Sequence, residues 1–372
     1  MPAFLLLCSL SATAQEKLGT ASRPIRLGMM LPLNNATNDG QHMIEYYRGV
    51  LMACDSLRKL GVSVEVRAWD VAEYSVLSKI LGQPETSRLD LIIGPFYSNK
   101  VQPLADFAAS HDIMLVLPYA VEASQLATNR HLFQVCQSQA MLNERTVERV
   151  CNWFKDCHPV IIDCADSEST RGAFTSALRK EFEKRGMKYN LTSLASPASS
   201  FQKAFDKKKR NLVILNSSRQ TSLASAFEKL NALKEKKSGL NISMLGYEEW
   251  QAYANVYPSY FHQYDLYLPS TYYTNMEQAG ASRLAQKYQW NFHEKMLPFV
   301  PRYALTGFDH AVFFLRGLYK YGKSFDGAEG RFGYAPVQTP LKFVRVGRGG
   351  YQNQGFLFVH YTTDRRIETI NY

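Results

Sequence analysis

The chain has few of the motifs by which catalytic sites are usually recognised. Its eight histidines are scattered, and it has no HExxH metal pair and no GxSxG turn. The glycine-rich run Gly347–Gly350 has no strand-to-helix setting, so it is interpreted as a turn. His42 and His310 stand near a predicted loop and a helix start, but a single histidine without a partner is usually structural. We therefore expect no enzyme, no catalytic residue, no metal site and no cofactor.

Cysteine and long apolar runs are also scarce. The 372 residues include six cysteines, whose spacing is neither a disulfide framework nor a set of CxxC pairs for zinc. Most are expected to be small core residues, and a bridge within the group Cys151, Cys157 and Cys164 is left open. Beyond the N-terminus, no stretch approaches the roughly 18 apolar residues of a membrane span.

The N-terminus has the order of a secretory signal. Apolar residues run from Phe4 to Leu10, and the small-residue triplet Ala12-Thr13-Ala14 follows, although no basic residue precedes Lys17. We expect a signal peptide over residues 1–14, cleaved after Ala14, and a mature protein in the periplasm. A disordered apolar terminus is the alternative.

The formal net charge of +10 is concentrated in two runs, Lys207–Arg210 and Lys234–Lys237, at the ends of predicted helices. A nucleic-acid site would need interleaved aromatic residues and a recognisable binding module, and neither run has them. These runs are therefore expected to be solvated helix faces, and no nucleic-acid partner is expected.

What the sequence has is two series of alternating strands and helices. The segment Arg88–Val121 reads as strand, helix, strand, with apolar runs that are typical of parallel strands buried on both faces. Ligands bind beyond the carboxyl ends of such strands, so the loops Phe96–Asn99 and Pro118–Val121 are expected to line one cleft. A second series starts at Val160–Cys164. The length and the two series predict an α/β protein with two Rossmann-like lobes.

The end of the chain departs from this alternation. Leu341–Val346 and Phe356–Thr362 are predicted to pair as a C-terminal β-hairpin across the glycine-rich turn.

Several motifs in this order resemble the type 1 periplasmic binding proteins, and most closely their branched-chain amino-acid-binding branch. They are Leu91-Ile92-Ile93-Gly94-Pro95, Leu245-Gly246-Tyr247-Glu248 and Gly307-Phe308-Asp309-His310-Ala311. The chain also contains the segments LPLNN, GYxEWQxY and PRY…GFD. In these segments it is similar to a Bacteroidetes-type group within that branch, whose members often carry a LysM domain. Residues 15–24 are too short for such a domain, so the resemblance implies no wall binding through LysM.

The resemblance implies that the chain crosses between the lobes and that they close about a hinge. Lobe 1 would comprise residues 24–138 plus 273–338, and lobe 2 residues 139–272 plus 339–372. The ligand would bind between them.

The resemblance also implies a set of ligand-binding residues: Ser98, Tyr119, Val121, Arg171, Glu248 and Tyr303. Ser98 would hold a ligand carboxylate at a helix N-terminus, Glu248 would accept the α-ammonium group, and Tyr303 would pack on the ligand. This chain departs from the family at three positions. Tyr119 replaces a small residue, Val121 a hydroxyl residue and Arg171 an aromatic residue. These departures argue against a plain branched-chain amino acid and permit a larger or acidic ligand, or a pocket that has lost its ligand.

Each of these positions also has a purely structural interpretation. Ser98 is a good helix N-cap, Glu248 could be a surface carboxylate beside Glu249, and Arg171 could face solvent or pair with Asp166 or Glu168. The tyrosines could simply pack, and Asp309 near a helix start would favour the helix dipole.

Two functions follow from these observations. The first is an exported, non-catalytic solute-binding protein that takes a small polar ligand (an amino acid, peptide or cell-wall fragment) and works with an ABC-type permease. The alternative is an envelope scaffold of the same fold that docks a cell-envelope protein or peptidoglycan. An open, polar cavity between the lobes favours binding, whereas Tyr119 and Tyr303 packed across it would favour the scaffold.

Overall fold

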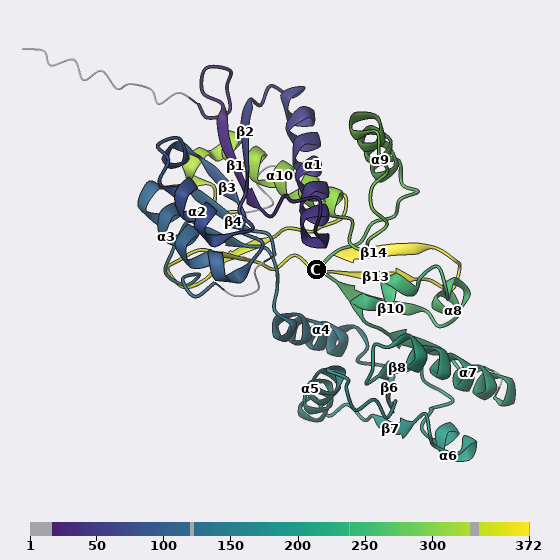
Figure 1. Ribbon diagram of the computed structural model, residues 1–372. Coiled ribbons are helices and arrows are strands. Elements are labelled where there is room, and N and C mark those ends of the chain that lie inside the picture. Colours follow the sequence, from purple (N-terminus) through teal and green to yellow (C-terminus); the bar gives the residue numbers. More distant parts are fainter. Residues whose placement is uncertain (1–16, 120–122, 238, 328–334, 372) are drawn as a thin grey trace, which may run out of the picture.

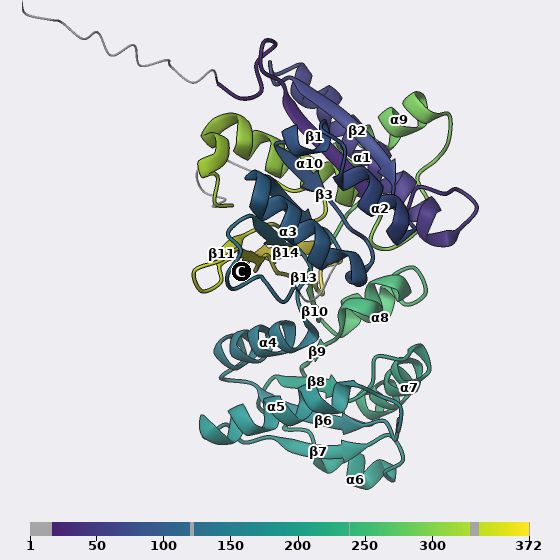
Figure 2. The same ribbon diagram turned by 60° about the vertical axis from the view of Figure 1, so that its left-hand side comes forward.

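The computed structural model describes residues 17–119, 123–237, 239–327 and 335–371. The predicted signal peptide and the candidate residue Val121 lie outside the described residues. Within them, two seven-stranded sheets form two lobes, which are stacked along the long axis of the molecule in Figure 2.

The first sheet has the strand order β11-β12-β5-β4-β3-β1-β2 and is parallel except for its edge strand β11. Its strands are β1 (Ile25–Leu31), β2 (Val64–Asp70), β3 (Leu91–Ile93), β4 (Met114–Leu117), β5 (Leu132–Gln134), β11 (Phe343–Arg345) and β12 (Tyr351–Asn353). All residues of β3 and β4 are buried. This agrees with the prediction, made from their uninterrupted apolar runs, that these parallel strands are covered on both faces.

The second sheet has the order β14-β13-β10-β9-β8-β6-β7, and β13 is antiparallel to both its neighbours. Its strands are β6 (His158–Asp163), β7 (Asn190–Ser193), β8 (Asn211–Leu215), β9 (Ile242–Leu245), β10 (Leu266–Ser270), β13 (Leu357–Tyr361) and β14 (Ile367–Asn371).

Helices flank both sheets (Figure 1). The first lobe carries α1 (Asn38–Arg58), α2 (Tyr74–Leu81), α3 (Val101–His111), α9 (Ala279–Phe292) and α10 (Tyr303–Tyr321), with 3₁₀ turns η1 (Thr86–Arg88), η2 (Ser98–Lys100) and η4 (Gly322–Ser324). The second carries α4 (Gln139–Trp153), α5 (Arg171–Lys184), α6 (Ala198–Lys203), α7 (Gln220–Lys236) and α8 (Pro258–Gln263), with the turn η3 (Glu248–Tyr253).

Helices α1 and α10 cross at two glycines. A Cβ atom on Gly49 would lie 1.9 Å from the Ala304 carbonyl oxygen, and one on Gly307 would lie 2.1 Å from that of Tyr46. Only residues without a side chain permit this approach, so the two glycines set how closely the helices pack.

The C-terminal segment pairs differently from the sequence prediction. Leu341–Val346 and Phe356–Thr362 do not pair with each other, because β11 pairs with β12 in the first sheet and β13 pairs with β14 in the second. The glycine-rich turn closes locally, with the Val346 amide donating to the Gly350 carbonyl (2.8 Å), so it joins β11 to β12. A C-terminal hairpin is present, but it is formed by β13 and β14.

These pairings also move part of the predicted lobe boundary. Residues 343–353 extend the first sheet through β12 and β5, although 339–372 was assigned as a whole to lobe 2. The chain therefore passes between the sheets after β5, after β10 and after β12. The other lobe limits stay a prediction.

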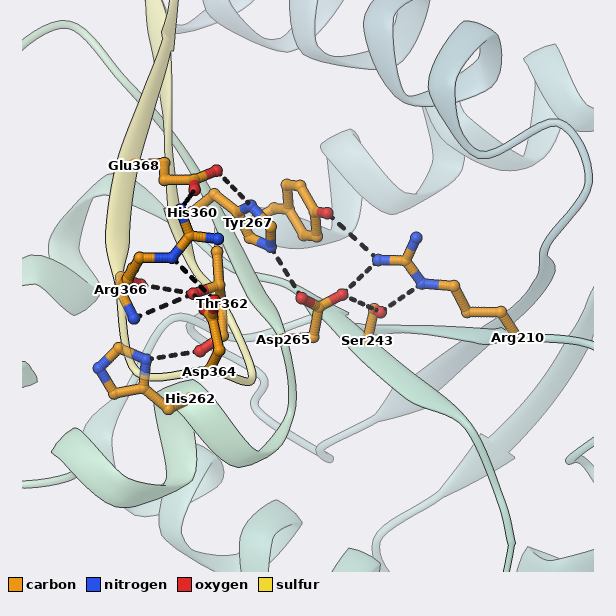
Figure 3. Close-up of polar contacts among 10 residues, drawn as sticks. All are labelled: Arg210, Ser243, His262, Asp265, Tyr267, His360, Thr362, Asp364, Arg366 and Glu368. Carbon is orange, nitrogen blue, oxygen red and sulfur yellow. Dashed lines mark hydrogen bonds and ion pairs between the residues drawn. The ribbon is translucent and has the colours of Figure 1, made fainter.

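A polar cluster joins the C-terminal hairpin to the neighbouring strands of the second sheet. Asp265, just before β10, accepts hydrogen bonds from Ser243 Oγ (2.7 Å), pairs with Arg210 and lies 2.8 Å from His360 Nε2 on β13 (Figure 3). The Tyr267 ring stacks on the His360 ring with centroids 3.9 Å apart.

Candidate functional site

A cavity of about 290 Å³ lies between the lobes at the carboxyl ends of β4, β5 and β10. The first lobe contributes Tyr119 and His310, the second contributes Glu248 and Tyr272, and the crossing segment after β5 contributes Gln137. The sequence analysis predicted a ligand site at the carboxyl ends of parallel strands.

Three buried polar atoms of the lining residues have no hydrogen-bond partner in the described part of the chain: His310 Nε2, Tyr119 Oη and Gln137 Oε1. Buried polar groups are nearly always paired, because an unpaired one loses its hydration without compensation. Three such atoms among the lining residues give this cavity polar groups whose hydrogen-bonding capacity the described residues do not use.

The His310 imidazole is held in the core of the first lobe. Its Nδ1 lies 2.9 Å from the hydroxyl of Tyr46, and burial lowers the pKa of His310 to about 3. The ring is therefore neutral, with one nitrogen occupied and Nε2 left unpartnered. Burial also raises the pKa of Tyr119 well above its usual range, so its hydroxyl keeps its proton.

Glu248 is the first residue of η3, and two residues separate it from the end of β9. Its Oε2 accepts hydrogen bonds from the Thr271 amide (2.6 Å), Thr271 Oγ1 (2.8 Å) and Ser270 Oγ (3.0 Å). No described residue donates to its Oε1. Glu248 is half-buried at the cavity, whereas its neighbour Glu249 is the exposed carboxylate of the pair. Its role as an ammonium acceptor stays a prediction.

Arg171 lies beside a second, smaller cavity of about 120 Å³ within the second lobe. It begins α5, is 7% exposed, ion-pairs with Glu249 and places its guanidinium over the Tyr247 ring, 4.6 Å from the centroid. The alternative that it faces solvent or pairs with Asp166 or Glu168 is wrong. Both of those carboxylates pair with Arg219 instead.

Ser98 and Tyr303 are not among the lining residues of either cavity. Ser98 is exposed and opens η2, whose N-cap is Tyr97, so the interpretation of Ser98 as an N-cap is wrong. Tyr303 stacks on His42 with ring centroids 4.5 Å apart and lies 6.1 Å from Tyr119. Tyr119 and Tyr303 both belong to the first lobe, so their contact does not close the space between the lobes.

Asp309 has a structural task other than the predicted one. Its carboxylate accepts hydrogen bonds from the backbone amides of Val337, Gln338 and Thr339 at 2.7 to 2.9 Å. Burial raises the pKa of Asp309 to about 7. The residue lies in the second turn of α10, and it fixes the loop before β11 instead of interacting with the helix dipole.

Sequence reasoning missed His310 as a cavity residue by interpreting it as structural. A signal was present, because Thr306 and His310 both line the cavity and are four residues apart on one face of α10. What sequence could not show is that Tyr46, on α1, would occupy one nitrogen of this ring.

Three further features of the described part of the chain concern metal ligands, thiols and membrane spans. It contains no cluster of three or more metal-ligating side chains, and the five cysteines from Cys54 to Cys164 are all free thiols. None of its helices is long and apolar enough to cross a membrane.

Comparison with known proteins relates the chain to others through its fold. No family model and no curated protein matches it. A branched-chain amino acid ABC transporter protein from Rhodospirillum rubrum is 14% identical with a TM-score of 0.63, over 93% of this chain and all of that one. One from Rhodopseudomonas palustris is 12% identical with a TM-score of 0.56, over 93% of this chain and 95% of that one. These structures confirm the two-lobed fold of the type 1 periplasmic binding proteins that the sequence motifs resemble.

Proposed function

We propose that this chain, which has the type 1 periplasmic binding protein fold, is an exported, non-catalytic solute-binding protein. It takes an amino acid, or another small polar ligand such as a short peptide or cell-wall fragment, into the cavity between its lobes. The observation that carries this proposal is the cavity itself, lined from both lobes and bordered by three unpartnered buried polar atoms. The structures of similar fold from Rhodospirillum rubrum and Rhodopseudomonas palustris, which are named as amino acid transporter proteins, support the choice of ligand class.

The two faces of the cavity differ in charge and hydrogen-bonding character. The first lobe presents the Tyr119 hydroxyl and the neutral His310 imidazole, and the second presents the Glu248 carboxylate. We assign the ligand carboxylate to Tyr119 and His310 and the ammonium group to Glu248 Oε1, because each face then meets a complementary group. Ser98 is exposed and outside the cavity, so we do not assign the carboxylate to it.

Closure of the lobes on the ligand would be the working motion. A ligand that contacts both lobes favours the closed form by its additional contacts there, and an ABC-type permease could recognise that form. Export requires the signal peptide predicted over residues 1–14, with cleavage after Ala14 placing the mature chain in the periplasm.

The scaffold function has one observation in its favour. The rings of Tyr303, His42 and Phe299 pack on one another as a cluster on the first lobe, so that these side chains make their contacts with each other. Because this cluster leaves the cavity between the lobes open, we favour ligand binding.

A thermal-shift screen of residues 15–372 against amino acids, short peptides and muropeptides tests the proposal. A ligand at 100 times its dissociation constant adds about 2.7 kcal/mol to the free energy of unfolding and raises the melting temperature by a few degrees. Glu248→Ala should abolish the shift, whereas Glu235→Ala, on the exposed side of α7, should retain it. A well-folded protein that responds to no member of the library would favour the scaffold instead.

A further inference from the structure

The smaller cavity in the second lobe is a neighbour of the cavity between the lobes. The two share Gln139, Leu142, Glu248 and Tyr272 in their linings. A ligand held by Glu248 therefore has space on two sides of that residue, about 290 Å³ between the lobes and about 120 Å³ toward α5.

Arg171 is the only cationic side chain among the described residues that line the smaller cavity. Its Nη2 binds Glu249, while its Nε is buried and has no hydrogen-bond partner among the described residues. These two nitrogens form one edge of the guanidinium, the edge that can hold a carboxylate through two parallel hydrogen bonds. Glu249 uses only half of this edge.

The surroundings keep Arg171 in place and make Glu249 exchangeable. The guanidinium is fixed over the Tyr247 ring, and its side chain is 8% exposed. The Glu249 side chain is 48% exposed, so it can return to water at little cost when another carboxylate takes its place. The N-terminus of α5, where Arg171 lies, adds positive potential.

We propose that the ligand carries a second carboxylate, as in an acidic amino acid or a short peptide with an acidic side chain. Its ammonium group binds Glu248, and its side-chain carboxylate enters the smaller cavity and binds Nε and Nη2 of Arg171 in place of Glu249. This inference rests on the proposed function, since it assigns the ligand class of the same site.

Isothermal titration calorimetry tests the inference with L-glutamate, L-aspartate, L-glutamine, L-asparagine, L-leucine and O-phospho-L-serine. The wild-type chain should bind an acidic amino acid at least about tenfold more tightly than the matching amide. Arg171→Gln should weaken binding of the acidic amino acid at least about tenfold and bring its affinity to that of the matching amide. Arg171→Lys keeps the charge but lacks the two-nitrogen edge, so it should restore only part of the preference.

A second variant keeps the test independent of any folding defect at Arg171. Glu249→Gln removes the competing carboxylate and should strengthen glutamate binding several-fold without strengthening glutamine binding. Circular dichroism and thermal melting would establish that each variant is folded.

The possible failures are distinguishable. Equal affinities for glutamate, glutamine and leucine that Arg171→Gln and Glu249→Gln leave unchanged would overturn the inference but support the proposed function. Phosphoserine binding more tightly than glutamate would assign Arg171 to a phosphate group and overturn the carboxylate assignment. If no amino acid binds the folded wild-type chain, the assignment of an acidic amino acid is overturned, and the peptides and muropeptides of the thermal-shift screen decide the proposed function.

Discussion

The hydroxyl of Tyr46 on α1 and Nδ1 of His310 on α10 lie 2.9 Å apart, in the contact between two buried helices. Gly49 and Gly307 let these helices approach closely, which brings the two side chains together. The contact occupies one nitrogen of the imidazole and leaves the other unpartnered at the cavity between the lobes. A candidate ligand-binding group is thus positioned by the core of the first lobe.

Tyr119→Phe should affect stability and ligand binding in opposite directions. The Tyr119 hydroxyl is buried without a partner among the described residues, so its removal should raise the free energy of unfolding of the ligand-free protein by about 1 kcal/mol. The same change removes a hydrogen bond to the ligand and should weaken affinity about tenfold. Chemical denaturation and calorimetry measure the two effects. A variant that is less stable yet binds normally would contradict this role.

Gly307→Ala should destabilise the first lobe strongly. Its Cβ would lie 2.1 Å from the Tyr46 carbonyl oxygen, so α1 and α10 would have to separate, at a cost of about 3 kcal/mol or more. Gly280→Ala in α9 is the matched control, because its Cβ would meet no atom within 4 Å. The control should stabilise by up to about 1 kcal/mol through helix propensity. Similar melting temperatures for the two variants would show that the helix crossing is not tightly packed.

Glu45→Gln should change how stability depends on pH. Burial raises the pKa of Glu45 from 4.5 to about 7, while its Oε1 accepts a hydrogen bond from the Leu297 amide (2.5 Å). The folded state therefore favours the protonated carboxyl group. The stability that Glu45 contributes is fully present below pH 4.5 and is lost as pH rises through about 7.

Glutamine keeps the acceptor for Leu297 and cannot ionise. The difference in unfolding free energy between variant and wild type should therefore grow by roughly 3 kcal/mol between pH 4.5 and 8. Urea denaturation at a series of pH values measures it, with the exposed Glu235→Gln as control. Taking this difference removes the background from Asp309 and His310, which titrate with opposite effects. A constant difference across this range would show that Glu45 is ionised in the folded protein.

The sequence predicted the parts of the fold that depend on local patterns. Leu91–Ile93 and Met114–Leu117 are short apolar runs around one helix, and they form parallel neighbours as such runs should. The pairing of β11 with β12 was missed because strands of three residues are too short to show alternation, and the longer apolar segments on either side of the turn suggested a different hairpin.

The site was less accessible to sequence reasoning. Glu248 lies in the loop that follows a strand, three positions after Leu245, so its place near a strand end could be predicted. The ion-pair partner of Arg171 could not be predicted from the sequence. Glu249 lies 78 positions away, and Asp166 and Glu168 are much nearer in the chain. Ser98 begins a 3₁₀ turn and is exposed, a difference of one or two residues at a helix start that sequence patterns do not resolve.

A crystal structure of the mature chain with the strongest thermal-shift ligand tests the central claim most directly. We predict electron density for the ligand between the lobes, with a ligand atom within hydrogen-bond distance of His310 Nε2 and of Tyr119 Oη, and the ammonium group at Glu248. A ligand bound elsewhere, with these three groups unchanged from the ligand-free structure, would contradict the account.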